Sequence, residues 1–338
     1  MKRTLIAVLA SHDSKEKNKE VARVLERLYK DDQATLAEFH FVFTGGTFDR
    51  LVLGLPDEEG SIMEPPLNQD VARFLKSNAT RLPERTKGGV TILANLIVQR
   101  QCSIIWPFLS PITVHWLNPE NLALSRLCDV WNAKRLMNAE SVEAWFRDEA
   151  KRDVRRNPQT MPLQMVFAIG GTCQAEWDAA NGYHAIKLPE RNKPSAESRC
   201  QFGDQVVALI AHDDMKARMV DFAIQYEPEL SQFKHILATG TTGQQVIDAC
   251  GTLRRLEKVK KCLSGPKGGD IEIATEILFD QCSVVVFFID PLHPHPHIDD
   301  IRVVLSACMA EIENNNVRML TNEVQAREWI EETVRRRG

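Results

Sequence analysis

An internal repeat constrains the fold of this 338-residue chain more than any other feature of its sequence. The segment "LPERTKGGVTILANLIVQRQCSIIWPFLSP" (82–111) matches "CLSGPKGGDIEIATEILFDQCSVVVFFIDP" (262–291), with "KGG" and "QCS" at the same offset and no gap between them. Two shorter matches precede it in the same order, namely 4–13 with 205–213 and 41–52 with 236–247. A repeat of so long a period predicts two copies of one domain, not a solenoid.

Each copy alternates short apolar runs with helical patterns. In the second copy the expected strands are 206–211, 235–240, 261–265, 283–290 and 317–322, and the expected helices are 215–226, 242–251, 269–278, 298–313 and 323–337. Strands composed almost wholly of apolar residues are buried on both faces, which indicates a parallel sheet covered by helices. The sequence therefore predicts the α/β class, with two tandem doubly wound, Rossmann-type domains of three layers.

The domain boundaries follow from changes in composition. The length suits two domains, and we expect them at 1–149 and 204–338. Residues 150–203 are predicted to be a linker or arm, because "KRDVRRNPQ" and "KLPERNKPSAES" are rich in charge and proline. Within that segment "LQMVFAIGGTCQAEW" is apolar enough for a strand and a turn, which either join one domain's sheet or form an arm for oligomerisation.

Charge and hydropathy argue against several classes of partner. A net charge of −4 and a pI near 6.2 disfavour nucleic acid, and no apolar run approaches the roughly 20 residues that span a membrane. The opening "MKRTLIAVLASHDSK" is predicted to be a core strand, since its apolar run is too short for a signal peptide. Eight cysteines without a CxxC pair indicate reduced, buried thiols and a cytoplasmic protein.

Two motifs of the second copy follow strands, where ligands bind in open α/β sheets. "AHDDMK" brings an imidazole and an ammonium group together, although its Asp also suits a helix N-cap. "ATGTTG" combines hydroxyls with glycines ahead of a helix, which suits a phosphate but also an ordinary turn. The candidate binding residues here are His212, Asp213, Lys216, Thr239, Gly240, Thr241, Thr242 and Gly243.

A third motif, "LSGPKGGD", repeats this chemistry with Ser264 and Gly265 and ends on the carboxylate of Asp270. The plain alternative is that Asp270 serves only the first turn of the following helix. Two phosphate-like loops at the same sheet edge favour a shared site over two coincidences.

The fourth motif, "FFIDPLHPHPHIDD", alternates histidine with proline. A metal clip would need further ligands at close spacing, so we predict no metal and an extended loop over the site. Asp290 ends a buried strand, where an acid is costly unless it is paired or functional. Asp300 follows His297 by three residues and is expected to orient its imidazole for proton transfer. His293 and His295 are expected to be loop residues.

Taken together, these motifs resemble methylglyoxal synthase in order and spacing over about 205–334. The resemblance implies loss of inorganic phosphate from dihydroxyacetone phosphate to give methylglyoxal, by a carbon–oxygen lyase that needs no cofactor. It implies that Asp270 is the base and that His297, held by Asp300, polarises the carbonyl. It further implies that Lys216 and the two loops hold the phosphate, that His212 contacts the substrate, and that Asp213 and Asp290 support the site. Because family members form homo-oligomers, the resemblance also implies that this protein is a homo-oligomer. The alternative is a non-catalytic phosphometabolite-binding protein of this fold.

The first copy keeps some of these residues but not the proposed base. It retains His12, Asp13, Thr44, Gly45 and Thr47, whereas Ser264, Gly265, Asp270, Asp290 and His297 become Glu84, Arg85, Val90, Ser110 and Leu117. Valine cannot accept a proton and Glu84 would repel phosphate, so we predict a catalytically inactive copy. We expect a structural role as a pseudo-subunit. The alternative is a regulatory ligand site, such as related domains provide in carbamoyl phosphate synthetase.

Overall fold

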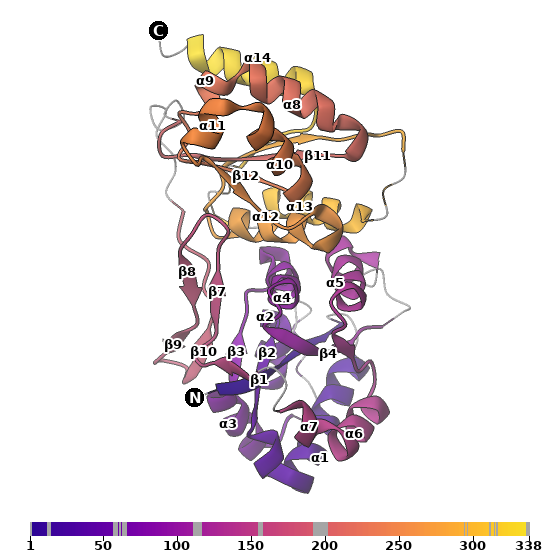
Figure 1. Ribbon diagram of the computed structural model, residues 1–338. Helices are drawn as coiled ribbons and strands as arrows, with labels where there is room; N and C mark the ends of the chain where they lie inside the picture. Colours follow the sequence, from indigo (N-terminus) through magenta and orange to yellow (C-terminus); the bar gives the residue numbers. More distant parts are fainter. Residues whose placement is uncertain are drawn as a thin grey trace. The chain divides into compact units, whose positions relative to one another are not determined.

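The computed structural model forms two compact units, each described here by itself (Figure 1). The first contains Met1–Val166 and Thr172–Lys187, and the second contains Phe167–Gly171 and Leu188–Gly338. The structure describes residues 2–11, 15–56, 60, 62, 66–110, 117–154, 158–191, 202–293, 295, 297–310, 312–313, 315 and 317–335. His12, Asp13 and residues 192–201 of the expected linker lie outside the described residues. Within those ranges, no helix is both long and apolar enough to cross a membrane.

The second unit is built on a parallel five-stranded sheet in the order β13–β12–β11–β14–β15. The strands are β11 (Val206–Ala211), β12 (His235–Ala238), β13 (Val259–Lys261), β14 (Val284–Phe288) and β15 (Arg318–Leu320). Both faces of β11 are buried, since all six of its residues are buried. The predicted doubly wound parallel sheet is thus confirmed for this copy.

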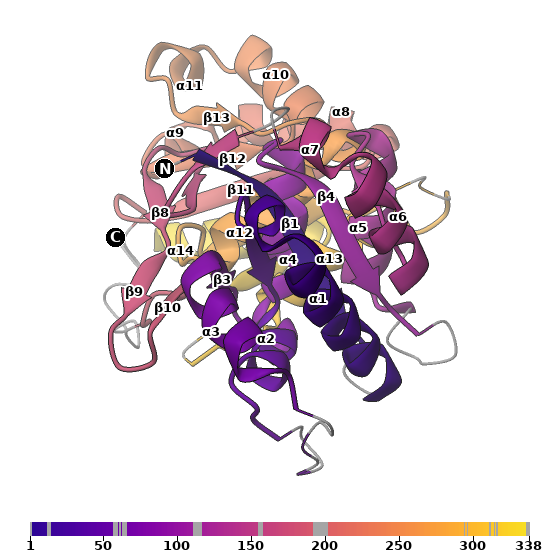
Figure 2. The same ribbon diagram turned by 90° about the horizontal axis from the view of Figure 1, so that it is seen from below.

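Helices cover both faces of this sheet (Figure 1). They are α8 (Lys216–Gln225), α9 (Glu227–Leu230), α10 (Gly240–Ala249), α11 (Gly251–Arg255), α12 (Gly269–Leu278), α13 (Ile298–Cys308) and α14 (Glu323–Arg335). One core cluster joins Val207 and Leu209 of β11 to Phe222 of α8, Val246 of α10 and Trp329 of α14. α12 and α13 pack together on the opposite face, and Figure 2 shows α10 and α11 beside β13.

The first unit repeats this topology, with β3–β2–β1–β4–β5 parallel and in the same order. Its parallel strands are β1 (Lys2–Ala10), β2 (Phe39–Phe43), β3 (Ala79–Arg81), β4 (Cys102–Phe108) and β5 (Lys134–Arg135). Its helices are α1 (Lys15–Leu36), α2 (Gly45–Leu51), α3 (Gln69–Asn78), α4 (Gly89–Val98), α5 (Pro119–Val130), α6 (Ala139–Asp148) and α7 (Ala150–Asp153). The expectation that the chain opens on a core strand is confirmed by β1.

The segment between the copies adds strands to the first unit. β6 (Pro158–Thr160) pairs with β1, and β10 (Tyr183–Ala185) joins β3 to β9 (Glu176–Asp178). β7 (Gln164–Val166) and β8 (Thr172–Gln174) form a separate hairpin. The turn of this hairpin belongs to the second unit, where the Ala168 N–H donates to Glu276 Oε1 of α12 at 2.5 Å. The sequence left two readings open for 163–177, sheet extension or an arm. Its strands β7 and β8 extend neither domain's sheet, whereas β9, at its end, extends the sheet of the first unit through β10.

Candidate active site

The two phosphate-like loops of the second unit are joined to each other at the carboxyl ends of β12 and β13. The Gly240 N–H donates to the Leu263 carbonyl at 2.9 Å. A Cβ on Gly240 would lie 3.0 Å from the Ser264 nitrogen, so glycine is what permits this close approach. The sequence placed these loops at one edge of the sheet, and the structure brings them into direct contact.

The threonine loop leads into α10. Thr239 and Thr242 are buried, their hydroxyl oxygens lie 3.4 Å apart, and Thr241 is exposed. The Gly243 N–H closes the first helical turn on the Thr239 carbonyl at 2.8 Å. The first turn of a helix carries unsatisfied N–H groups and the positive end of the helix dipole, so this loop suits an anion.

A tight turn between Ser264 and Asp270 aims the proposed base. Residues Gly265–Lys267 form a 3-10 turn, and Gly268 has a φ of +102°, which favours glycine. A Cβ on Gly269 would lie 1.9 Å from the Leu263 carbonyl oxygen, so no other residue fits there. These constraints start α12 at Gly269 and place Asp270 in its first turn, only 2% exposed.

Asp270 faces His297 across a short gap. The Oδ2 of Asp270 lies 3.7 Å from the Nε2 of His297. Gly265 lines this gap, because a Cβ there would come within 2.9 Å of the Asp270 oxygen and 2.8 Å of the His297 nitrogen. A carboxylate and an imidazole therefore converge from α12 and from the N-cap of α13 on one small space.

A second acidic residue of α12 holds the loop, and sequence reasoning missed it. Glu272 accepts a hydrogen bond from the Leu263 N–H at 2.6 Å, and burial raises the pKa of its carboxyl group. The available signal was its position, since "GDIEIATEIL" puts three acids into an otherwise apolar helix. In the first copy the residue equivalent to Glu272 is Ile92.

His212 follows β11, the central strand of the sheet. Its Nδ1 accepts the Asp290 N–H at 2.8 Å, and burial lowers the pKa of its imidazole to about 4. A neutral ring that accepts at Nδ1 carries its proton on Nε2, and within the described part of the chain that buried atom has no hydrogen-bond partner. The ring of His295 lies against it, with centroids 3.5 Å apart. His295, expected to be a simple loop residue, therefore packs directly on a candidate site residue.

Asp290 organises the histidine loop. Its Oδ1 accepts the Leu292 N–H at 2.9 Å and its Oδ2 lies 2.6 Å from His293 Nδ1. The Leu292 hydrogen bond, followed by that of His293, lowers the pKa of Asp290, while Asp290 raises the pKa of His293. Asp214, Asp290 and His293 could offer three ligand atoms to a cation, but the hydrogen bond already accounts for the Asp290–His293 approach.

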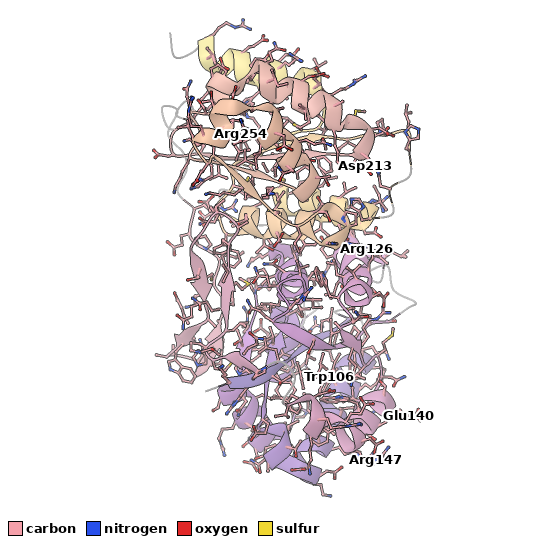
Figure 3. The ribbon with its side chains drawn as sticks, viewed as in Figure 1. Trp106, Arg126, Glu140, Arg147, Asp213 and Arg254 are labelled. Atoms are coloured by element: carbon pink, nitrogen blue, oxygen red, sulfur yellow. The ribbon has the colours of Figure 1, made fainter. Side chains whose placement is uncertain are left out.

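Three predicted residues remain: Lys216, Asp213 and Asp300. Lys216 forms an ion pair with Asp213, whose side chain is 88% exposed (Figure 3). Asp300 is fully buried in α13, and its backbone N–H donates to the His297 carbonyl at 3.0 Å. That its carboxylate orients the imidazole stays a prediction.

Comparisons with known proteins find relatives for about a third of the chain. No protein-family model matches it. It is 39% identical over 128 residues to the methylglyoxal synthase of Rhizobium rhizogenes, which is 38% of this chain and 94% of that protein. It is 42% identical over 120 residues to the methylglyoxal synthase of Cupriavidus taiwanensis, which is 36% of this chain and 83% of that protein. A methylglyoxal synthase structure from Elizabethkingia anophelis aligns with a TM-score of 0.33 at 29% identity, covering 38% of this chain and 78% of that one.

Proposed function

Because the chain belongs to the methylglyoxal synthase family, we propose that its second unit converts dihydroxyacetone phosphate to methylglyoxal and inorganic phosphate. The observation that carries the proposal is the pair of Asp270 and His297, 3.7 Å apart over a glycine. Phosphate binding alone requires neither of them. A base and a proton donor on either side of a space for a small molecule suit the removal of a proton next to a carbonyl group.

The substrate phosphate binds between the two joined loops. Thr239 and Thr242, Ser264 and the N–H groups that begin α10 supply neutral donors, and Lys216 supplies a positive charge. Asp213 already binds Lys216 in the structure, so the substrate phosphate competes with an exposed carboxylate for this ammonium group. The carbon chain then extends toward Gly265, where no side chain separates it from Asp270.

Asp270 takes a proton from the hydroxyl-bearing carbon next to the carbonyl. The electrons of that C–H bond form the carbon–carbon double bond of an enediolate, whose oxygens need fixed donors. His297 donates to the former carbonyl oxygen and carries a proton between the two oxygens. The Nε2–H of neutral His212 is a further donor at this edge.

Phosphate leaves in the second step. Electrons from the enediolate form a new double bond toward the carbon that bears phosphate, and the carbon–oxygen bond breaks. Phosphate departs with the electron pair of that bond, and the resulting enol of methylglyoxal tautomerises to the product. Elimination needs the breaking bond perpendicular to the enediolate plane, so the loops set conformation as well as affinity.

The first unit is proposed to be inactive in this reaction. Its equivalent of Asp270 is Val90, which is buried and cannot accept a proton. Arg85 takes the place of Gly265, whose lack of a side chain opens the gap in the second unit. One active unit per chain follows.

The test is product formation by the full chain in a buffer containing EDTA. Dihydroxyacetone phosphate should yield methylglyoxal and inorganic phosphate in equal amounts, while glycerol 3-phosphate, which lacks the carbonyl, should yield neither. Binding of dihydroxyacetone phosphate in a calorimeter without any product would instead establish a non-catalytic phosphometabolite-binding protein.

A further inference from the structure

The first unit contains a cavity of about 280 Å³ at the carboxyl ends of its strands. Its walls come from the end of β1, from α2, from the 84–86 turn and from α5, including Ser11, Thr47, Arg85 and Asn121. These elements correspond by sequence and topology to those that carry the candidate active site in the second unit. The volume lies near the lower end of the range for small-molecule sites.

The lining has lost the acid of the reaction but gained other polar groups. Arg85 replaces Gly265 and Asn121 replaces Ile301, and Asn121 is only 5% exposed. Arg50, also in the lining, is 7% exposed, whereas its equivalent Gln245 lies in solvent. Buried polar groups are kept where they have polar partners, so this lining is polar at positions where the second unit is apolar or exposed. A polar lining of this kind suits a polar ligand.

The charge of the lining favours an anion. Its two acids are balanced by cations outside the lining. Asp49 accepts two hydrogen bonds from Arg81, at 2.8 and 2.6 Å, and Glu84 lies 3.4 Å from the Lys87 ammonium group. With the two acids balanced in this way, the two arginines of the lining, Arg50 and Arg85, give it a positive charge. The second unit has no such charged pair, since the residues equivalent to Arg81 and Asp49 are Lys261 and the neutral Gln244, 2.6 Å apart.

Hydroxyl groups in the same lining add neutral donors. Thr44 and Thr47 share one hydrogen bond at 3.0 Å, which uses one of their two hydroxyl hydrogens and leaves the other to donate. Leu9, Val90 and Leu109 supply apolar walls. The lining of the cavity therefore combines positive and hydroxyl groups with apolar side chains.

We propose that this cavity binds a small organic anion, with its phosphate or carboxylate group on Arg85 and the threonine hydroxyls and its carbon skeleton against Val90. The bound molecule is not converted, because no carboxylate replaces Asp270. The first unit is then a ligand-binding domain, not only a pseudo-subunit.

Calorimetry on the full chain tests the proposal with four probes: inorganic phosphate, glucose 6-phosphate, succinate and citrate. For at least one probe we expect a binding event that Arg85→Ala weakens about ten- to hundredfold, the usual loss for a charge-assisted hydrogen bond. Arg147→Ala is the matched control, because it removes the same charge from an exposed position on α6 (Figure 3). Whether the phosphate or the carboxylate probes bind identifies the head group.

A second variant guards against an effect of misfolding. Asn121→Ile, which installs the residue of the second unit, should also weaken that event, and both variants should melt at the wild-type temperature. Lys216→Ala should weaken only phosphate binding in the second unit. The proposal is overturned if Arg85→Ala binds every probe as Arg147→Ala does, or if Lys216→Ala removes all binding.

Discussion

The turns that precede α4 and α12 share one backbone conformation but carry different side chains at the positions proposed for catalysis. In each, a 3-10 turn ends on a glycine in the left-handed region, with φ of +85° at Gly88 and +102° at Gly268. The next glycine in each lies against a carbonyl oxygen, so that a Cβ would come within 2.0 Å at Gly89 and 1.9 Å at Gly269.

The side chains on this shared backbone differ at the positions that matter for a reaction. In the first copy, Val90 occupies the position of Asp270, and Arg85 occupies the position of the glycine that opens the gap to His297. α4 buries only apolar side chains and the neutral Thr91 and Asn95, whereas α12 buries Asp270 and Glu276. The paired glycines are therefore what the turn needs in order to form, whereas Asp270 and Gly265 are what the proposed reaction needs.

The largest effect should come from the glycine that both turns require. Gly269→Ala and Gly89→Ala each force a methyl group against a backbone carbonyl, and overpacking of this kind costs about 3 kcal/mol. We expect similar losses of stability, measured by hydrogen exchange of the amides in α12 and in α4. Only Gly269→Ala should abolish methylglyoxal formation, and equal loss of activity in both variants would break the comparison.

The next effect should come from Gly265. A methyl group there would displace the Asp270 carboxylate and the His297 ring, and a misplacement of about 1 Å can cost about a hundredfold in rate. Gly265→Ala should therefore lower kcat by about that factor with little change in melting temperature. Gly251→Ala is the control, because a Cβ at that position meets no atom within 4 Å. Wild-type kcat in Gly265→Ala would show that the gap needs no glycine.

A smaller effect should appear in the pH dependence of stability. Burial raises the pKa of Glu276 to about 7, above its value in the unfolded chain. A carboxyl group whose pKa is raised by folding contributes most stability below its unfolded pKa and loses it as pH rises through the folded value. The free energy of unfolding of the second unit should thus fall by about 2 kcal/mol between pH 5 and pH 8.

Glu276→Gln tests this dependence, because the amide oxygen can still accept the Ala168 N–H while carrying no charge. Urea unfolding followed through α12 should then vary little between pH 5 and pH 8. The equivalent residue in the first copy is Leu96, so the first unit supplies an internal reference. If the free energy of unfolding of the variant still fell with pH as in the wild type, Glu276 would not be the cause of the pH dependence.

The smallest effect concerns the histidine loop. Nitrogen-detected NMR should find His212 neutral at pH 5.5, protonated on Nε2 only, since burial lowers its pKa to about 4. His293 should be protonated at the same pH, because Asp290 raises its pKa, and His293→Ala should change kcat less than twofold. A charged His212 at pH 5.5 would contradict its proposed role as a neutral donor.

The sequence predicted the architecture well because apolar periodicity and the repeat encode it. The strand 206–211 and the helix 269–278 agree residue for residue with β11 and α12. The strand expected at 261–265 was wrong, since β13 ends at Lys261. The Leu263 carbonyl accepts a hydrogen bond from the Gly240 N–H, and the Leu263 N–H donates to Glu272, so neither group is available to a sheet. Such loop-to-loop hydrogen bonds leave no periodic trace in a sequence.

The site could be predicted only as a set of residue types at one sheet edge. Its motifs placed Asp270, His297 and the two loops together, since each motif follows a strand of a parallel sheet. Two further features depend on side-chain packing between distant segments. They are the contact of the His295 ring with His212 and the hydrogen bond from the Leu263 N–H to Glu272. Neither could be inferred from spacing alone.

The most direct test of the account is the kinetics of Asp270→Asn. If this carboxylate removes the substrate proton, kcat for methylglyoxal formation should fall by at least about a thousandfold, while inorganic phosphate binds the second unit as in the wild type. A variant that retains kcat within tenfold of the wild type would contradict the assignment of Asp270 as the base.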